Sequence, residues 1–264
     1  MLAGQVIELI EKVAPLSWQE SWDNSGLQIG QRDQQVTSAL LCTDVTEAIV
    51  AEALEKGCEM IISHHPLLFH GLRCIDGSTA QQRCVIEAIR NDLVIYSSHT
   101  AMDSFVDGVS GYMAKKLGMA DYHLLTADAL GTHGLGVIGE LSEPMSNDEF
   151  LQLLADTFSV ASIRYVPKRN EDEALSKVAL CGGAGSEFLE TAIKQGADAF
   201  VSADFKYHDL QRAEGRVAVF DIGHFESEHF TKEIFRDILK DYIRCELAES
   251  DVNPISVFVN KKML

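Results

Sequence analysis

Two adjacent histidines follow a short apolar segment in this sequence. The segment MIISHHP covers residues 60–66, and its histidines are His64 and His65. The apolar residues predict a buried strand, and the proline ends it. The tip of a buried strand has no packing need for imidazole, whereas imidazole is a common metal ligand. The two rings would point to opposite sides of a regular strand, so they can serve one site only if the chain leaves its regular path there. Pro66 favours that departure.

Two more histidines are each followed by a carboxylate four residues later. His99 precedes Asp103, and His224 precedes Glu228. On a helix, this spacing puts both side chains of a pair on one face. Each pair follows an apolar strand-like segment. In open α/β sheets, ligands bind beyond the carboxyl ends of strands, which is where all three histidine groups are predicted.

The three strand ends together offer four imidazoles and two carboxylates. This donor set suits Zn, Mn, Fe, Co or Ni. Six ligands exceed the usual four of one structural zinc site. Two divalent ions that share a carboxylate would use them better, and Glu228 is the predicted bridge. The alternative is that strand-end histidines are turn or core residues. Four other histidines have no such context and are interpreted as surface or structural residues: His70, His123, His133 and His229.

An internal repeat supplies the elements that must position these groups. Residues 39–70 align without a gap to residues 178–209, and residues 92–103 align to 218–228. Each copy reads as an apolar strand, an amphipathic helix, a glycine and a second strand, and then a third strand followed by the histidine and carboxylate. This is the pattern of β-α-β units. It predicts an α/β protein with two similar halves.

Other segments give further expectations of secondary structure. Helical spacing of apolar residues predicts an N-terminal helix over residues 6–13. The remaining expected helices cover residues 108–117, 147–157 and 230–245, and the remaining expected strands cover residues 134–141, 162–166 and 255–259.

Three polar segments are further candidates for function. SWDNSGLQIG (21–30) suits a turn, with Trp22 as an anchor of the loop. CGGAGSE (181–187) is either a tight turn or a place where helix amides hold a phosphate. SADFKYHD (202–209) is either a capped helix start or a segment that flanks the metals. In the second case Asp204, Lys206 and His208 would contact substrate.

Composition excludes some classes of function. The 264-residue chain has a formal net charge of −18, which argues against broad contact with nucleic acid or anionic lipid. No apolar run is long enough to span a bilayer, and the N-terminus lacks the features of a signal peptide. A cytoplasmic location is therefore expected. The six cysteines show no CxxC spacing and are interpreted mainly as buried apolar residues.

The whole chain resembles the NIF3-like family, also known as GTP cyclohydrolase 1 type 2 homologues. The motifs that carry the resemblance occur in order: SWDNSGLQIG, SHHPLLFHGL, SSHTAMDS, GADAFVSADFKYHDLQRA and DIGHFESEHF. The resemblance implies an α/β fold with mixed sheets, made of two repeats over residues 1–127 and 128–264. The second repeat is intertwined with the first, and a dinuclear metal site lies between them. It also implies a toroidal homohexamer. The family's ligand positions correspond to His64, His65, Asp103, His224 and Glu228, with His99 beside them.

Two functions follow from this reading. The first is a metal-dependent hydrolase that acts on a nucleotide or another phosphorylated or heterocyclic small molecule, such as GTP. In that case His99 or His208 would relay a proton. The second is a non-catalytic metal-binding adaptor whose ring-shaped assembly presents a surface to partner proteins.

Overall fold

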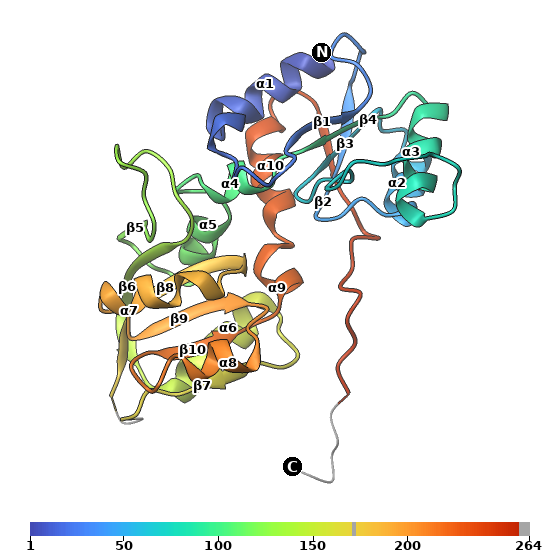
Figure 1. Cartoon of the computed structure of the whole chain (residues 1–264). Coiled ribbons are helices and arrows are strands. Elements are labelled where there is room, and N and C mark those ends of the chain that lie inside the picture. Colours follow the sequence, from blue (N-terminus) through green and yellow to red (C-terminus); the bar gives the residue numbers. More distant parts are fainter. Residues whose placement is uncertain (171–172, 259–264) are drawn as a thin grey trace. The chain divides into compact units, whose positions relative to one another are not determined.

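The computed structural model describes residues 1–170 and 173–258, and the chain divides into two compact units. Unit 1 contains Met1–Val109, Ala127–Leu135 and His229–Asp251. Unit 2 contains Ser110–Thr126, Gly136–Glu228 and Val252–Leu264. Each unit has its own sheet and one copy of the sequence repeat (Figure 1).

Unit 1 is built on a five-stranded mixed sheet with the order β1-β4-β3-β2-β11. Strands β2, β3, β4 and β11 are parallel, and β1 pairs antiparallel with β4. The carboxyl ends of β3 and β4 therefore meet at one edge. The strands are β1 (Gly26–Ile29), β2 (Ser38–Cys42), β3 (Met60–Ser63), β4 (Val94–Ser97) and β11 (Arg244–Leu247).

Helices cover both faces of this sheet, which explains why its strands are short continuous apolar runs. Leu40, Ile61 and Ile95 pack in one core cluster with apolar residues of α2 and α3, while α1 and α10 lie on the other face (Figure 1). The helices of unit 1 are α1 (Ala3–Val13), α2 (Glu47–Glu55), α3 (Ala80–Arg90), α4 (Thr100–Asp103) and α10 (Thr231–Leu239), with a 3-10 turn η1 (Leu16–Trp18).

Two carboxylates, the half-buried Glu59 and the buried Asp251, hold the two ends of β2. Before the strand, Glu59 accepts hydrogen bonds from the hydroxyls of Thr37 and Ser38, both at 2.8 Å. Burial raises the pKa of Glu59, but these bonds outweigh burial and lower the pKa to about 2. After the strand, Asp251 accepts from the Thr43 amide at 3.0 Å and pairs with the Lys232 ammonium at 3.1 Å.

Unit 2 is built on a six-stranded mixed sheet with the order β5-β6-β8-β9-β10-β7. β8 pairs parallel with β9, and β9 pairs parallel with β10, whereas the other neighbouring pairs are antiparallel. The strands are β5 (Tyr122–Leu124), β6 (Val137–Met145), β7 (Arg164–Val166), β8 (Leu175–Ala184), β9 (Ala199–Ala203) and β10 (Ala218–Asp221). The helices are α5 (Val109–Lys116), which starts at the boundary between the units, α6 (Asn147–Phe158), α7 (Leu189–Lys194), α8 (Tyr207–Gln211) and α9 (His224–Glu228), with a 3-10 turn η2 (Ser186–Phe188).

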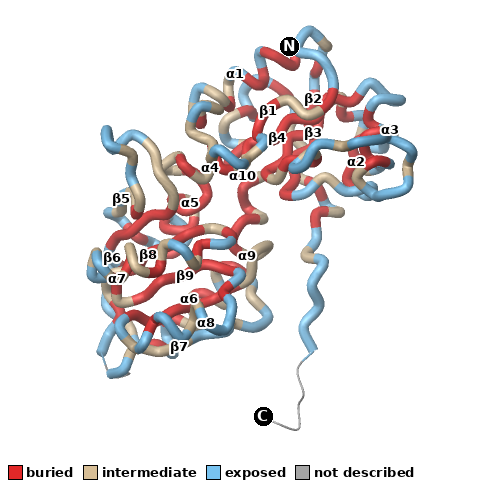
Figure 2. The backbone as a smooth tube through the Cα atoms, viewed as in Figure 1, coloured by how far each residue is buried: buried red, intermediate tan, exposed pale blue. Residues whose placement is uncertain are grey.

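The repeat predicted from sequence is confirmed element by element. Strands β2, β3 and β4 correspond to β8, β9 and β10, and α4 corresponds to α9. Helix α2 corresponds to η2 and α7 taken together. Figure 2 shows that the central strands of both sheets are mostly buried, β2, β3 and β4 in unit 1 and β8, β9 and β10 in unit 2. The α/β fold with mixed sheets is therefore confirmed.

Two predicted elements are wrong at the C-terminal end. The helix expected over residues 230–245 ends at Leu239, because the following residues form β11 at the open edge of β2. The strand expected over residues 255–259 is absent from the described part, where residues 255–258 form no ladder, and Val259 lies outside the described residues. A strand needs a sheet edge to pair with. Helix α3 and strand β1 were not predicted from the sequence, and their segments were expected to be connections.

None of the helices in residues 1–170 and 173–258 is long and apolar enough to cross a membrane.

Candidate metal centre

His64 and His65 lie just beyond β3, where the chain leaves the regular pleat. The His64 amide still donates to the carbonyl of Cys42, at 3.1 Å, and the His65 amide donates to the carbonyl of Thr43, at 2.9 Å. The imidazole rings nevertheless come together, with centroids 4.9 Å apart. The His64 ring is fully buried, and the His65 ring is 22% exposed. The departure from strand geometry that a common site requires is therefore present.

β4 and α4 bring a third imidazole and a carboxylate to the same cluster. The His99 ring centroid lies 5.2 Å from that of His64 and 5.3 Å from that of His65. One ligand atom from each of these three histidines falls within 4.8 Å of the other two. Asp103, at the end of α4, places Oδ1 3.7 Å from His64 Nε2. We call these four residues the unit 1 half-site.

Unit 2 holds the second histidine–carboxylate pair on α9. The helix begins at His224, and the i, i+4 spacing brings His224 Nε2 to 2.9 Å from Glu228 Oε2, as predicted. Glu228 is buried, with 3% of its surface exposed. Gly183 allows the end of β8 to approach it closely, since a Cβ at that position would lie 2.2 Å from Glu228 Oε1. We call His224 and Glu228 the unit 2 half-site.

The four histidines of the two half-sites share one hydrogen-bond arrangement, in which Nδ1 faces an oxygen acceptor. For His65 the acceptor is Asp44, at 2.9 Å. For the others it is the Ser98 carbonyl (His64, 3.1 Å), Asp23 (His99, 2.8 Å) and Asp204 (His224, 2.7 Å). When Nδ1 donates its proton, Nε2 carries the lone pair that a metal binds. Metal-ligating histidines almost always have such a partner.

The spacing within the half-sites also fits a metal ion. Two ligands bound at about 2.1 Å to one ion lie roughly 3.0–3.6 Å apart for octahedral to trigonal angles. His64 Nε2 and Asp103 Oδ1, at 3.7 Å, are close to this range. His224 Nε2 and Glu228 Oε2, at 2.9 Å, are close to its lower end. Imidazole nitrogen with carboxylate oxygen is a donor set for Zn and similar transition metals.

Comparison with known proteins identifies the family. The family model described as Duf34/NIF3 (NGG1p interacting factor 3) matches residues 1–255. The chain belongs to the NIF3 family. A GTP cyclohydrolase 1 type 2 homologue of Clostridium perfringens is 35% identical over 230 residues, which cover 86% of this chain and 87% of that protein. NIF3-like protein 1 of Drosophila melanogaster is 30% identical, over 95% of this chain and 87% of that protein.

Solved structures show the same NIF3-like fold. A hypothetical protein of Staphylococcus aureus matches with a TM-score of 0.88 and 28% identity, over 98% of this chain and 99% of that one. A Bacillus cereus protein related to NIF3 matches with a TM-score of 0.89 and 22% identity, over the same shares of the two chains. The family membership expected from the sequence motifs is confirmed.

Two carboxylates that contact histidines of the unit 1 half-site were not predicted from the sequence. Asp23 was read only as a turn residue of the SWDNSG segment, and Asp44 was not considered. Asp44 lies two residues beyond the end of β2, so its place near a strand end was a signal that could have found it. Asp23 comes from a loop some 76 residues before His99, so only the tertiary structure pairs them.

Asp23 is held as a carboxylate by its neighbours. Its side chain is fully buried, and burial acts to raise its pKa. Hydrogen bonds from His99, Thr100 and Ser25 outweigh burial and hold the pKa of Asp23 well below its usual range. The charged Asp23 therefore orients His99 and binds the hydroxyl and amide of Thr100.

Asp204 positions His224 through an unusual backbone conformation. Its φ of 57° lies in the left-handed region, which aspartate tolerates better than most residues. Asp204 was read either as part of a capped helix start or as a residue that flanks the metals, and the structure puts its carboxylate on His224 Nδ1.

His208, the other predicted catalytic residue, lies on the exposed surface of α8. Its Nδ1 is 3.0 Å from Gln211 Oε1. Among the described residues, the clusters of candidate ligands do not include His208. His133 stacks on Trp18, with ring centroids 5.1 Å apart.

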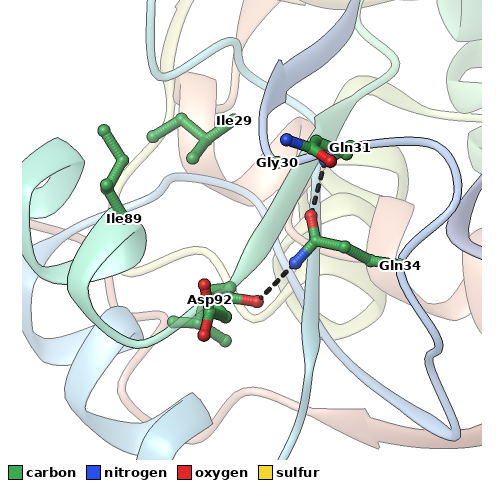
Figure 3. Close-up of a pocket in the computed structure, with 7 residues that line it drawn as sticks. Ile29, Gly30, Gln31, Gln34, Ile89 and Asp92 are labelled. Carbon is green, nitrogen blue, oxygen red and sulfur yellow. Dashed lines mark hydrogen bonds between the residues drawn. The ribbon is translucent and has the colours of Figure 1, made fainter.

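A separate cavity of about 440 Å³ lies near the amino-terminal end of β4, whereas the histidines lie beyond the carboxyl ends of β3 and β4 (Figure 3). It is lined by Ile29, Gly30, Gln31, Gln34, Ile89, Asp92 and Leu93. Gln34 spans it by accepting from the Gln31 amide and donating to the carbonyl of Asp92, at 2.9 Å. Its lining includes none of the candidate histidines. A second cavity, of about 450 Å³, adjoins the half-site, because His65 and Asp44 are part of its wall.

Proposed function

We propose that this chain binds two divalent transition-metal ions and uses them to hydrolyse a small molecule. The observation that carries the proposal is the shared arrangement of the four histidines, each with Nδ1 against an oxygen acceptor. A structural histidine needs no such repeated orientation, whereas a metal ligand does.

The proposal includes one dinuclear centre made from both half-sites. The unit 2 half-site offers only two ligands, which is too few for a four-coordinate ion. Glu228 is also the last residue of its segment of unit 2, and the chain continues at once into unit 1 at His229. A buried carboxylate with two oxygens at such a crossing suits a bridge between ions.

The protein's own residues would prepare the site for hydrolysis. Bound ions of this kind supply Lewis acidity and lower the pKa of a water molecule. Asp23, Asp44 and Asp204 hold the imidazoles in one orientation, which preorganises the ligands. His99 is placed either to complete the ligand set or to move a proton, since the Asp23 carboxylate holds its ring in one orientation. His208 is proposed as a second proton carrier.

The first substrate class to test is a guanine nucleotide. The Clostridium perfringens relative and several others carry the name GTP cyclohydrolase 1 type 2 homologue. Hydrolytic opening of the guanine five-membered ring requires an activated water and an electrophilic group, and a dinuclear site supplies both.

Metal content tests the proposal without relying on turnover. Elemental analysis after loading with Zn²⁺ or Mn²⁺ is expected to give about two ions per chain. His64→Ala should lose at least one ion. His70→Ala is the matched control, because His70 is exposed and belongs to no ligand cluster in the described residues. A content near zero for the loaded wild type, or equal loss in both variants, would refute the assignment.

Activity then separates the hydrolase from the alternative adaptor. We expect loaded protein to release product from GTP or a related compound, and Asp103→Asn and His208→Ala to slow that release. A protein that binds two ions but turns over no nucleotide or heterocycle in a broad screen would favour the adaptor.

We also propose a homohexamer, on the ground of family membership alone. Light scattering coupled to gel filtration should then give about six times the chain mass of 29.1 kDa. A stable monomer at micromolar concentration would contradict this proposal.

A further inference from the structure

Two large aromatic side chains lie exposed beside the unit 1 half-site. Trp22 is 57% exposed and Phe69 is 38% exposed. Their ring centroids are 6.0 Å apart. The His99 ring centroid lies 5.9 Å from that of Trp22 and 6.1 Å from that of Phe69. The two rings therefore border the histidine cluster directly.

The loops that carry these rings are fixed in place. The side-chain amide of Asn24 donates to the carbonyl of Leu68, at 2.6 Å, and the Leu68 amide donates to Gln28, at 3.1 Å. These bonds join the Trp22 loop to the Phe69 loop. Each ring is thus attached to a loop that is held in place by hydrogen bonds to the other loop.

The Trp22 loop is also tied to the start of α4. The Glu20 amide donates to the Thr100 hydroxyl, at 2.9 Å, and the Asp23 carboxylate, next to Trp22, accepts from the Thr100 amide at 3.1 Å. The same Asp23 holds His99. Trp22 and His99 are therefore positioned by one shared residue.

Folding alone does not account for this exposure. The other tryptophan, Trp18, is half-buried and stacks on His133 at an interplanar angle of 3°. Trp22 instead leaves more than half of its surface to solvent, at a free-energy cost that burial would remove. Exposed aromatic rings on loops held by hydrogen bonds, beside a candidate metal site, are typical of a surface that binds a ligand.

We propose that Trp22 and Phe69 form a stacking platform for a planar nitrogen heterocycle. The protein would recognise its substrate by this heterocycle. This inference rests on the proposed function and narrows its substrate class. The rings are tilted by 51° and only 6.0 Å apart, so a ligand does not fit between them. It stacks on the open face of Trp22, with Phe69 at its edge and His99 next to it.

The tryptophans themselves supply the test. The sequence contains two, so Trp18→Phe leaves Trp22 as the sole indole. Zn²⁺-loaded Trp18→Phe protein is titrated with guanosine, which has no phosphate to chelate the metal. Stacking is expected to quench the Trp22 fluorescence with saturation. Ribose 5-phosphate, which lacks the heterocycle, should cause no saturable quenching. Saturable quenching by ribose 5-phosphate, in the absence of guanosine, would overturn the proposal.

Calorimetry on variants of the full, loaded chain gives the second measurement. Trp22→Ala should weaken guanosine binding by about 5- to 150-fold, which is the range for loss of one stacked base, and Trp22→Phe should restore part of it. Ile89→Ala is the matched control. Ile89 has the same exposed fraction, 57%, but lines the cavity of Figure 3 near the amino-terminal end of β4, away from the histidines.

Metal content of every variant separates this inference from the proposed function. The inference predicts unchanged zinc in Trp22→Ala together with weaker guanosine binding. Wild-type guanosine affinity in Trp22→Ala, with zinc retained, would overturn the platform and leave the metal site standing. Loss of zinc in Trp22→Ala would show that the ring serves the half-site instead. Absence of zinc from the wild type would refute the proposed function itself.

Discussion

Gly183 offers the sharpest test of Glu228 as a metal ligand. An alanine Cβ at this position would lie 2.2 Å from Glu228 Oε1 and 3.3 Å from His224 Cε1. The glycine cannot easily retreat, because its amide donates to the Ser227 hydroxyl and its carbonyl accepts from Ser202. In Gly183→Ala the carboxylate must therefore move by about 1 Å to reach ordinary contact distance.

The expected magnitudes follow from two separate effects. The φ of Gly183 is +61°, which costs alanine about 1–2 kcal/mol in the free energy of unfolding. The clash adds about 1–3 kcal/mol. A shift of about 1 Å also exceeds the tolerance of roughly 0.2 Å on a metal–ligand distance. We therefore expect Gly183→Ala to weaken binding of at least one metal ion tenfold or more.

Gly57 supplies the matched control. Its φ is +63°, and an added Cβ would meet no atom within 4 Å. Gly57→Ala should therefore carry the same backbone cost and keep both ions. The assays are urea unfolding and competition for Zn²⁺ against a chromophoric chelator. Wild-type zinc affinity in Gly183→Ala, or equal loss in the two variants, would refute the role given to Glu228.

Three further outcomes are expected. Asp23→Asn removes the charge that orients its histidine partner, so zinc affinity should fall by about 10- to 100-fold in the same competition assay; unchanged affinity would reduce Asp23 to a turn residue. Glu59 has a pKa lowered to about 2, so its contribution to stability is complete above its unfolded pKa of 4.5 and is lost as the pH falls toward 2. Glu59→Gln should cost about 1–3 kcal/mol at pH 7 and little at pH 2, as judged from urea midpoints, and a loss that does not depend on pH would contradict this. Asp251→Asn weakens the pair with Lys232 and should cost about 1–3 kcal/mol without change in metal content, and a wild-type urea midpoint would count against it.

Local sequence patterns predicted the repeated units well. Apolar runs, helix-ending glycines and strand-end histidines are encoded within about 30 consecutive residues, so each copy of the repeat could be read directly. The prediction failed where an element depends on a distant partner. β11 forms because β2 has an open edge, and the residues near Arg244 contain no signal for the presence of that edge. The helix expected to run to Cys245 was wrong for this reason.

The same division applies to the candidate site. The sequence by itself determined the ligand types and the spacing of His224 and Glu228. Side chains at positions i and i+4 of a helix lie next to each other in any tertiary environment. Only the tertiary structure decided that His99 faces Asp23 and that Trp22 stays exposed beside it. Those contacts join loops far apart in the chain. Their formation depends on the order of strands in the sheet, which no local pattern records.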